Sequence, residues 1–163
     1  MEWRNIILRI SVVVTTYNGK MHLEKQLLSL LQQERAPDEV LIFDDGSTDG
    51  TIELVQSFIR KNCLESWQFY VNAKRKGWKQ NFMEGLRKAA GDILFPCDQD
   101  DIWYPKKLAE MTAVMEQHPE IKLLACDYRV LYESGALKAT VYKKTPAETQ
   151  GLITRYGFTK HFF

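Results

Sequence analysis

The chain reads VLIFDDGSTDGT over residues 40–51, and this stretch decides the fold. Its first four residues are apolar and, with the residue before them, predict a buried strand over 39–43. Residues 44–47 have the composition of a turn, and Asp49 is a candidate N-cap for a helix. That helix is predicted from apolar residues at helical spacing, namely Ile52, Val55 and Ile59.

Strand-like and helix-like segments alternate on both sides of this stretch. Further strands are predicted from short apolar runs at 10–15, 67–71, 93–95 and 123–132. The other helices are predicted from apolar residues at helical spacing: Leu23, Leu27, Leu30 and Leu31, then Phe82, Leu86 and Ala89, then Leu108, Met111 and Met115. Because strand and helix alternate, we expect right-handed crossovers and a mainly parallel sheet with helices on both faces. The fold class is therefore α/β and Rossmann-like, in a single domain over residues 1–163.

The composition excludes several classes of protein. With 163 residues, of which 45% are hydrophobic and 26% charged, the chain has the size and balance of one globular domain. Lys and Arg number 22 against 21 Asp and Glu, and a net charge of +1 argues against nucleic acid as a partner. There is no run of about 18 apolar residues, so no membrane-spanning helix is expected. The cysteines, Cys63, Cys97 and Cys126, have no C-x-x-C spacing, which predicts buried thiols in a reducing compartment.

The unusual polar residues of the chain directly follow predicted strands. They are residues 15–18 after the first strand, Asp44 and Asp45 after the second, and residues 98–101 after the strand at 93–95. In parallel α/β sheets, ligands bind outside the carboxyl ends of the strands. We therefore expect these residues to share one edge of the sheet and to form the functional site there.

The last of these segments places the carboxylates of Asp98, Asp100 and Asp101 within four positions. Like charges at such spacing repel one another unless a cation lies between them. Carboxylates together with phosphate oxygens suit Mg²⁺ or Mn²⁺. The alternative is a charged loop that interacts with the dipole of the next helix.

The other segments each have two interpretations. Asp45 either accepts an N–H group of a pyrimidine ring or belongs only to a turn and helix cap. Tyr17 either stacks on a base, with Thr15 bonded to the carbonyl edge of that base, or packs locally before a turn at 18–19. The basic loop 74–79 either neutralises a diphosphate or is simply solvated.

Together, these segments resemble the family 2 inverting glycosyltransferases, which have the GT-A nucleotide-sugar-binding fold. The resemblance extends from about residue 10 to about residue 132. The matching stretches are residues 12–18, 40–51, 81–82, 91–92 and 98–103. The last of them, DQDDIW, is similar to bacterial rhamnosyltransferase-like members, which build cell-surface polysaccharide.

The resemblance implies a set of site residues. The nucleotide-binding residues would be Thr15, Tyr17, Asn18, Asp45, Gly77, Asn81 and Asp98. Within this set, Thr15, Tyr17 and Asp45 would hold the base, Asp98 would approach the ribose or the diphosphate, and Gly77 and Asn81 would line the donor pocket. Asp100, with Asp101 beside it, would hold the divalent cation, Mg²⁺ or Mn²⁺. Thr15 departs from the family pattern, because many members have proline there.

The implied reaction moves a sugar, with inversion, from a UDP- or dTDP-linked donor to a saccharide or lipid-linked acceptor. A carboxylate would deprotonate the acceptor, and in the family this base lies well downstream of the acidic motif. Since residues 149–163 contain no carboxylate, we expect a donor-binding portion that is truncated at the C-terminus, without its catalytic base. The resemblance implies a cytoplasmic location, at the inner face of the cell membrane. The aromatic segment 156–163 is a candidate for self-association.

Three other functions compete with this interpretation. A sugar-phosphate nucleotidyltransferase would need a glycine-rich basic loop after the first strand, where this chain has only Gly19 and Lys20. A dinucleotide oxidoreductase would need G-x-G-x-x-G there, which is absent. A non-catalytic nucleotide- or carbohydrate-binding fragment is favoured by the missing base, whereas the retained acidic motif favours an enzyme.

Overall fold

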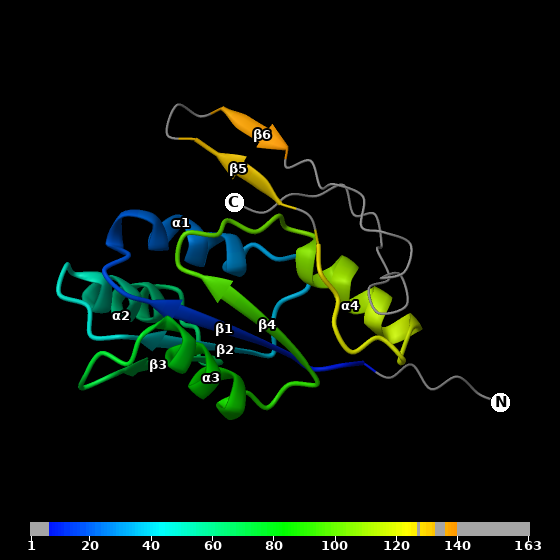
Figure 1. Cartoon of the computed structure of the whole chain (residues 1–163), viewed down its shortest axis with the longest axis horizontal. Coiled ribbons are helices and arrows are strands. Elements are labelled where there is room, and N and C mark those ends of the chain that lie inside the picture. The colour runs from blue at the N-terminus through cyan, green and yellow to red at the C-terminus, as the bar shows by residue number, and fades with distance from the viewer. Residues whose placement is uncertain (1–6, 127, 133–135, 140–163) are drawn as a thin grey trace.

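Strands and helices alternate in the computed structural model (Figure 1), which describes residues 7–126, 128–132 and 136–139. The strands are β1 (Ile10–Thr16), β2 (Glu39–Asp44), β3 (Trp67–Val71), β4 (Ile93–Asp98), β5 (Arg129–Leu131) and β6 (Leu137–Ala139). The helices are α1 (Lys20–Leu31), α2 (Thr51–Lys61), α3 (Trp78–Lys88) and α4 (Lys107–Gln117). The predicted alternation is therefore confirmed from β1 to α4.

The first four strands form one parallel sheet in the order β3-β2-β1-β4. The chain adds strands outward on one side of β1 and then crosses to the other side, so the strand order reverses between β1 and β4. In open α/β sheets, the crevice outside the carboxyl ends at such a reversal is the place where ligands bind. The topology thus points to the loops that follow β1 and β4.

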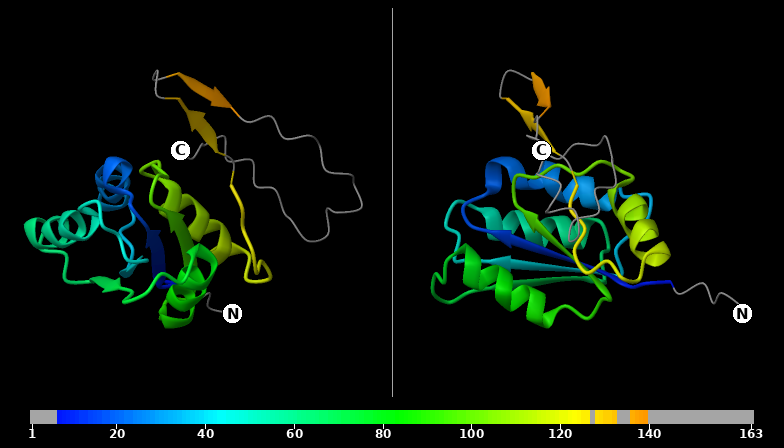
Figure 2. Two further views of the ribbon diagram at one scale, coloured as in Figure 1. Left: turned by 60° about the vertical axis from the view of Figure 1, so that its left-hand side comes forward. Right: turned by 45° about the vertical axis from the view of Figure 1, so that its right-hand side comes forward.

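Helices cover both faces of this sheet, as expected (Figure 2). One face carries Ile10, Val12 and Val14, which pack against apolar side chains of α1, α2 and α4. The opposite face carries Val13, which lies in a smaller cluster covered by α3. Since alternate side chains of a strand point to opposite faces, burial on both faces explains why residues 12–14 of β1 are consecutive valines.

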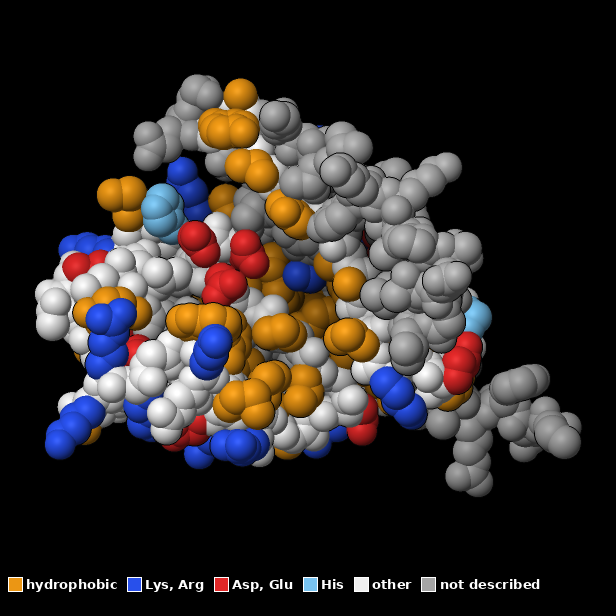
Figure 3. Space-filling model, in the orientation of Figure 1, with side chains coloured by type: hydrophobic (Ala, Val, Ile, Leu, Met, Phe, Trp, Pro, Cys, Tyr) orange, Lys and Arg blue, Asp and Glu red, His pale blue; other side chains and the backbone are white. Residues whose placement is uncertain are grey.

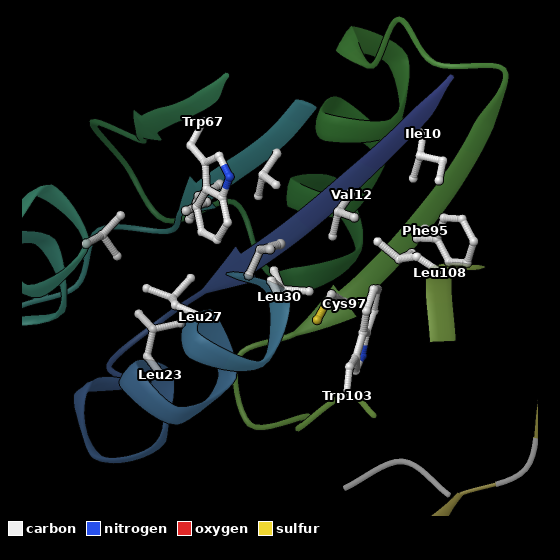
Figure 4. Close-up of a cluster of buried hydrophobic side chains, with 14 of the residues drawn as sticks. Ile10, Val12, Leu23, Leu27, Leu30, Trp67, Phe95, Cys97, Trp103 and Leu108 are labelled. Atoms are coloured by element: carbon white, nitrogen blue, oxygen red, sulfur yellow. The ribbon is translucent and has the colours of Figure 1, made fainter. Parts of the chain in front are cut away.

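The larger core cluster shows which helix positions face the sheet (Figure 4). Leu23, Leu27 and Leu30 of α1 are buried, whereas Leu31, predicted on the same face, is 39% exposed. Cys97 and Trp103 lie in the cluster at the end of β4. Cys97 is buried as expected, but Cys63 is exposed and Cys126 is only partly buried. None of the three cysteines, which all lie in the described part of the chain, forms a disulfide.

Two local predictions are wrong. The predicted strand at 123–132 is reduced to β5, which pairs antiparallel with β6 in a separate two-stranded sheet. The apolar run therefore predicted a strand in this segment but did not specify the strand with which it pairs, because long-range packing decides that pairing. The N-cap of α2 is Gly50, not Asp49; Gly50 has a φ of 93°, and Asp49 instead accepts the Thr51 amide at 3.0 Å.

No helix in the described part is long and apolar enough to cross a bilayer.

Candidate functional site

The strand ends bring the three polar segments together. Thr15 is aligned with Phe43 of β2 and with Asp98 of β4, and Thr16 is aligned with Asp44. Parallel strands end at the same edge of a sheet, so residues 15–18, 44–45 and 98–101 share that edge, as expected. The site is therefore centred on the reversal of strand order between β1 and β4.

Asp44 and Asp45 have different roles in this site. Asp44 is fully buried. Its Oδ1 accepts the main-chain amides of Gly46 at 3.0 Å and Ser47 at 2.7 Å, and its Oδ2 accepts the hydroxyls of Thr16 at 2.7 Å and Ser47 at 2.5 Å. The bonds of Asp44 thus serve the turn, which leaves Asp45 as the carboxylate available for another task.

Asp45 joins the end of β2 to the loop before α3. Its Oδ1 accepts the Lys76 amide at 2.7 Å and the Asn72 side-chain amide at 3.0 Å, and its Oδ2 accepts the Gly77 amide at 2.8 Å. The Nε of Arg75 lies 4.0 Å from Oδ2. Burial raises the pKa of Asp45, but these donors and Arg75 outweigh burial, so the pKa lies below its ordinary value. An N–H group of a nucleotide base would have to bond to carboxylate oxygens of Asp45 that already hold this loop. Contact between Asp45 and a nucleotide base therefore stays a prediction.

Gly77 and Asn81 belong to the same loop structure. Gly77 has a φ of 85° and a ψ of 152°, a conformation that side-chain-bearing residues rarely adopt. Asn81 is buried; its Oδ1 accepts the Asn72 side chain at 2.8 Å, and its Nδ2 donates to the Phe43 carbonyl at 2.8 Å. Both predicted pocket residues thus fix the course of the loop between β3 and α3, and contact with a nucleotide stays a prediction.

Tyr17 presents an aromatic ring at this edge and is 36% exposed. The guanidinium carbon of Arg75 lies 3.9 Å from the centroid of that ring, which is a cation–π contact. Exposed aromatic faces beside arginine are suitable platforms for nucleotide bases and their phosphates. Arg75 is not among the individually predicted site residues, although the basic loop 74–79 indicates its position.

Thr15 and Asn18 are tied into the structure around Tyr17. Thr15 is buried near the end of β1. The main-chain amide of Asn18 donates to the Ser47 hydroxyl at 2.8 Å, and its Oδ1 accepts the Thr48 amide at 2.9 Å. Asn18 therefore connects the loop after β1 to the loop after β2, while nucleotide contact by either residue stays a prediction.

Gln99 joins the loop after β4 to the residue that follows β1. Its Oε1 accepts the main-chain amide of Tyr17 at 2.8 Å, and its Nε2 donates to the main-chain carbonyl of Tyr17 at 3.2 Å. The glutamine side chain thus pairs with both main-chain polar groups of one residue. The sequence contains no distinct signal for this role, because a glutamine between aspartates also suits an ordinary polar loop.

Asp98 ends β4, and Asp100 and Asp101 lie in the loop that follows it. Figure 3 shows a group of acidic side chains beside a hollow lined by apolar atoms. Burial, followed by the charge of Asp100, raises the pKa of Asp98. Burial, followed by the charge of Asp98, raises the pKa of Asp101 to about 6. Lys107, whose own pKa falls to about 8 because of burial, offsets part of this effect on Asp101. Negative charge in the loop is therefore only partly balanced.

This loop fits a hard divalent cation that shares its coordination with a phosphate. Among the described residues, no three His, Cys, Asp or Glu side chains form a metal site by themselves. Mg²⁺ commonly takes only one or two carboxylates, because substrate phosphates and water complete its coordination. Oxygen donors and unbalanced negative charge both match that chemistry.

The sequence of residues 11–148 matches the family described as Glycosyl transferase family 2. The chain belongs to this family. The expected family 2 glycosyltransferase is thereby confirmed, and the match argues against a nucleotidyltransferase. The chain spans 49% of the length of putative glycosyltransferase EpsE of Bacillus subtilis and 26% of the length of TarS of Staphylococcus aureus, two curated relatives that it matches.

Individual relatives of this family 2 chain carry informative names. Poly(ribitol-phosphate) beta-N-acetylglucosaminyltransferase TarS of Staphylococcus aureus is 28% identical over 155 residues, which cover 94% of this chain and 26% of TarS. The structure of TarS 1-349 in complex with UDP-GlcNAc has a TM-score of 0.62 and 28% identity, covering 68% of this chain and 32% of that one. Mannosyltransferase PcManGT from Pyrobaculum calidifontis, in complex with GDP-Man and Mn²⁺, has a TM-score of 0.69 and 27% identity, covering 75% of this chain and 36% of that one. The α/β fold is thus the GT-A fold of these glycosyltransferases.

Proposed function

We propose that this family 2 chain binds a UDP- or dTDP-sugar and serves its transfer, with inversion, to an acceptor hydroxyl. The observation that carries the proposal is that Tyr17, just after β1, lies beside the acidic segment at the end of β4: Thr15 is aligned with Asp98, and Gln99 bonds to the Tyr17 main chain. A nucleoside diphosphate needs both an aromatic face for its base and a cation for its phosphates. The binding of UDP-GlcNAc by TarS and of GDP-Man with Mn²⁺ by PcManGT supports the same class of donor.

Each residue of the site has a proposed role toward this donor. Tyr17 stacks on the pyrimidine, and Arg75, which lies against the Tyr17 ring, supplies positive charge near the phosphates. Asp98 approaches the ribose or the diphosphate. Asp100 and Asp101 hold Mg²⁺ or Mn²⁺. A bound divalent cation offsets the negative charge that develops on the leaving diphosphate.

The proposed chemistry is a single displacement. The acceptor oxygen forms a bond to the anomeric carbon while the bond from that carbon to the diphosphate oxygen breaks, so the configuration inverts. The hydroxyl proton passes to a carboxylate base, and the nucleoside diphosphate leaves. We assign no described residue as this base. The proposed acceptor is a saccharide or lipid-linked saccharide of cell-surface polysaccharide, at the cytoplasmic face of the membrane, and the proposed transfer is rhamnosyltransferase-like.

Calorimetric titration tests donor binding. UDP, dTDP and GDP are titrated into the chain with and without Mn²⁺, and a pyrimidine nucleotide is expected to bind more tightly with the metal. Asp100→Ala is expected to remove the metal-dependent part of the affinity. Glu65→Ala is the matched control, because Glu65 is exposed and precedes β3 at the opposite edge of the sheet.

Two results would contradict the proposal at different levels. Equal metal dependence in Asp100→Ala and in the wild type would remove the metal assignment. Donor binding by the full-length protein, with no release of nucleoside diphosphate from any nucleotide sugar in the presence of acceptor, would favour a binding module that does not turn over.

A further inference from the structure

Gln99 lies within the acidic loop after β4, and its side chain bonds to the end of another strand. It accepts from the Tyr17 amide at 2.8 Å and donates to the Tyr17 carbonyl at 3.2 Å. A single hydrogen bond lets the two loops rotate about it, whereas two bonds to one residue fix both their separation and their relative orientation. Gln99 thus holds the main chain of Tyr17 in register with the loop that carries Asp98 and Asp100.

Gly19 makes room for this arrangement. A Cβ atom added at Gly19 would overlap the carboxamide of Gln99. The backbone itself would accept a side chain there, because Gly19 has a φ of −103°. The space above Gly19 is therefore occupied by Gln99, and the absence of a side chain at position 19 permits the contact with Tyr17.

We propose that Gln99 is a positioning residue that couples the cation-binding carboxylates to the base-stacking ring of Tyr17. This inference rests on the proposed function, in which one nucleoside diphosphate reaches both places at once. Asp100, one of the two proposed cation ligands, directly follows Gln99, so fixing Gln99 against the Tyr17 main chain also limits the distance between the cation site and the aromatic ring. Such pre-organisation reduces the entropy that is lost when a ligand binds two sites together. Binding of a cation therefore favours binding of the base, and the reverse.

The coupling predicts a specific defect in Gln99→Ala. Mn²⁺ is expected to raise the affinity for UDP less in this variant than in the wild type. The increase caused by Mn²⁺ should be smaller by roughly tenfold, which is the size expected for the loss of two hydrogen bonds. The affinity for uridine, which has no phosphate to contact the cation, is expected to change little. Gln56→Ala is the matched control, because Gln56 is an exposed glutamine on α2. A merely structural role would lower both affinities together and leave the effect of Mn²⁺ unchanged, which would overturn the proposal.

Gly19→Ala provides a second route to the same defect. The added methyl group displaces the Gln99 carboxamide, so this variant is expected to lose the same coupling while Gln99 is still present. Adding Gly19→Ala to Gln99→Ala is then expected to have no further effect, because the overlapping group is already gone. Full Mn²⁺ dependence in Gly19→Ala, or additive losses in the double variant, would contradict the proposal.

A measurement without nucleotide separates this inference from the proposed function. Mn²⁺ alone is expected to slow hydrogen exchange of the Tyr17 amide in the wild type and in Gln56→Ala, but not in Gln99→Ala. If the wild type binds no nucleotide, the proposed function fails, while the exchange experiment still tests the link between cation and Tyr17. If Mn²⁺ slows exchange equally in Gln99→Ala, the link is overturned even where nucleotide binding is intact.

Discussion

Asp45 accepts the main-chain amide of Gly77 at 2.8 Å, which ties the carboxyl end of β2 to the N-cap of α3. The neighbouring amide of Lys76 donates to the other carboxylate oxygen of Asp45 at 2.7 Å. Two consecutive amides thus converge on one nearly buried carboxylate, as in an anion-binding turn. The Asp45 carboxylate, which directly follows β2, therefore anchors the loop that carries Arg75 to the ring of Tyr17.

Asp45→Ala is expected to lower the free energy of unfolding by about 2–4 kcal/mol at neutral pH, because two partly buried amides lose a charged acceptor. The folded pKa of Asp45 lies below its ordinary value of 3.8, so its stabilising effect is complete above that value and is lost as pH falls through the folded pKa. Urea unfolding at neutral pH and at a pH below 3.8 measures this dependence. Glu65→Ala is the control, and a loss in Asp45→Ala that is the same at both pH values would contradict the assignment.

Gly77→Ala is expected to cost about 1–3 kcal/mol of unfolding free energy through backbone strain alone. This variant separates backbone strain from steric overlap. An added Cβ would meet no atom within 4 Å, but the φ of Gly77 is 85°, which residues with a side chain rarely adopt. Ala73→Gly, in the same exposed loop, is the control for a change of side chain without a required positive φ. Urea unfolding measures both variants, and unchanged stability in Gly77→Ala would show that the loop adopts another conformation.

Asp101→Asn is expected to stabilise the protein by about 1 kcal/mol at neutral pH, after allowing for partial exposure of the side chain. The folded pKa of about 6 lies above the ordinary value of 3.8, so the ionised carboxylate disfavours the folded state. This penalty is absent below 3.8, grows as pH rises, and is complete above about 6. Urea unfolding without metal, at pH values on either side of this window, measures the effect. Glu24→Gln on the exposed side of α1 is the control. If Asp101→Asn is less stable than the wild type at neutral pH, the prediction is contradicted.

Tyr17→Ala is expected to weaken binding of a pyrimidine nucleoside diphosphate by about 1–3 kcal/mol, the usual worth of one aromatic stacking contact. Tyr17→Phe keeps the ring and is expected to bind like the wild type. The fold is expected to be intact in both variants, because the Tyr17 side chain is partly exposed and its main-chain bonds to Gln99 do not depend on the ring. Calorimetry measures the affinity, with Tyr128→Ala as an exposed-tyrosine control. Equal loss in Tyr17→Phe would point to the hydroxyl instead of stacking.

The architecture was predictable wherever a local pattern and burial agree. Residues 12–14 of β1 are consecutive valines because both faces of that strand are covered, and the leucines of α1 recur at helical spacing because one side packs on the sheet. The same reasoning fails at residues 123–132, where an apolar run predicts a strand but does not specify the strand with which it pairs. Residues 149–163, with the expected self-association segment at 156–163, lie outside the described residues.

The sequence predicted which types of residue form the site, but it did not predict which contact each residue makes. The pair at 44–45 indicates a turn with one carboxylate to spare, and the structure assigns the turn to Asp44. Nothing in the sequence distinguishes Gln99 from other loop glutamines, or Arg75 from its basic neighbours. Both roles depend on contacts with Tyr17, which lies about 82 positions before Gln99 and about 58 positions before Arg75.

The sequence by itself determined the succession of strands and helices, the family, and the edge of the sheet at which the polar residues collect. These features depend on hydrophobic periodicity and on the residue types directly after each strand, both of which are local. Only the tertiary structure decided that Asp45 holds a loop, that Gln99 joins Tyr17 to the acidic segment, and that the acidic side chains are partly desolvated. Hydrogen bonds between distant residues and the burial of charge depend on which distant segments meet, and no local pattern in the sequence specifies that.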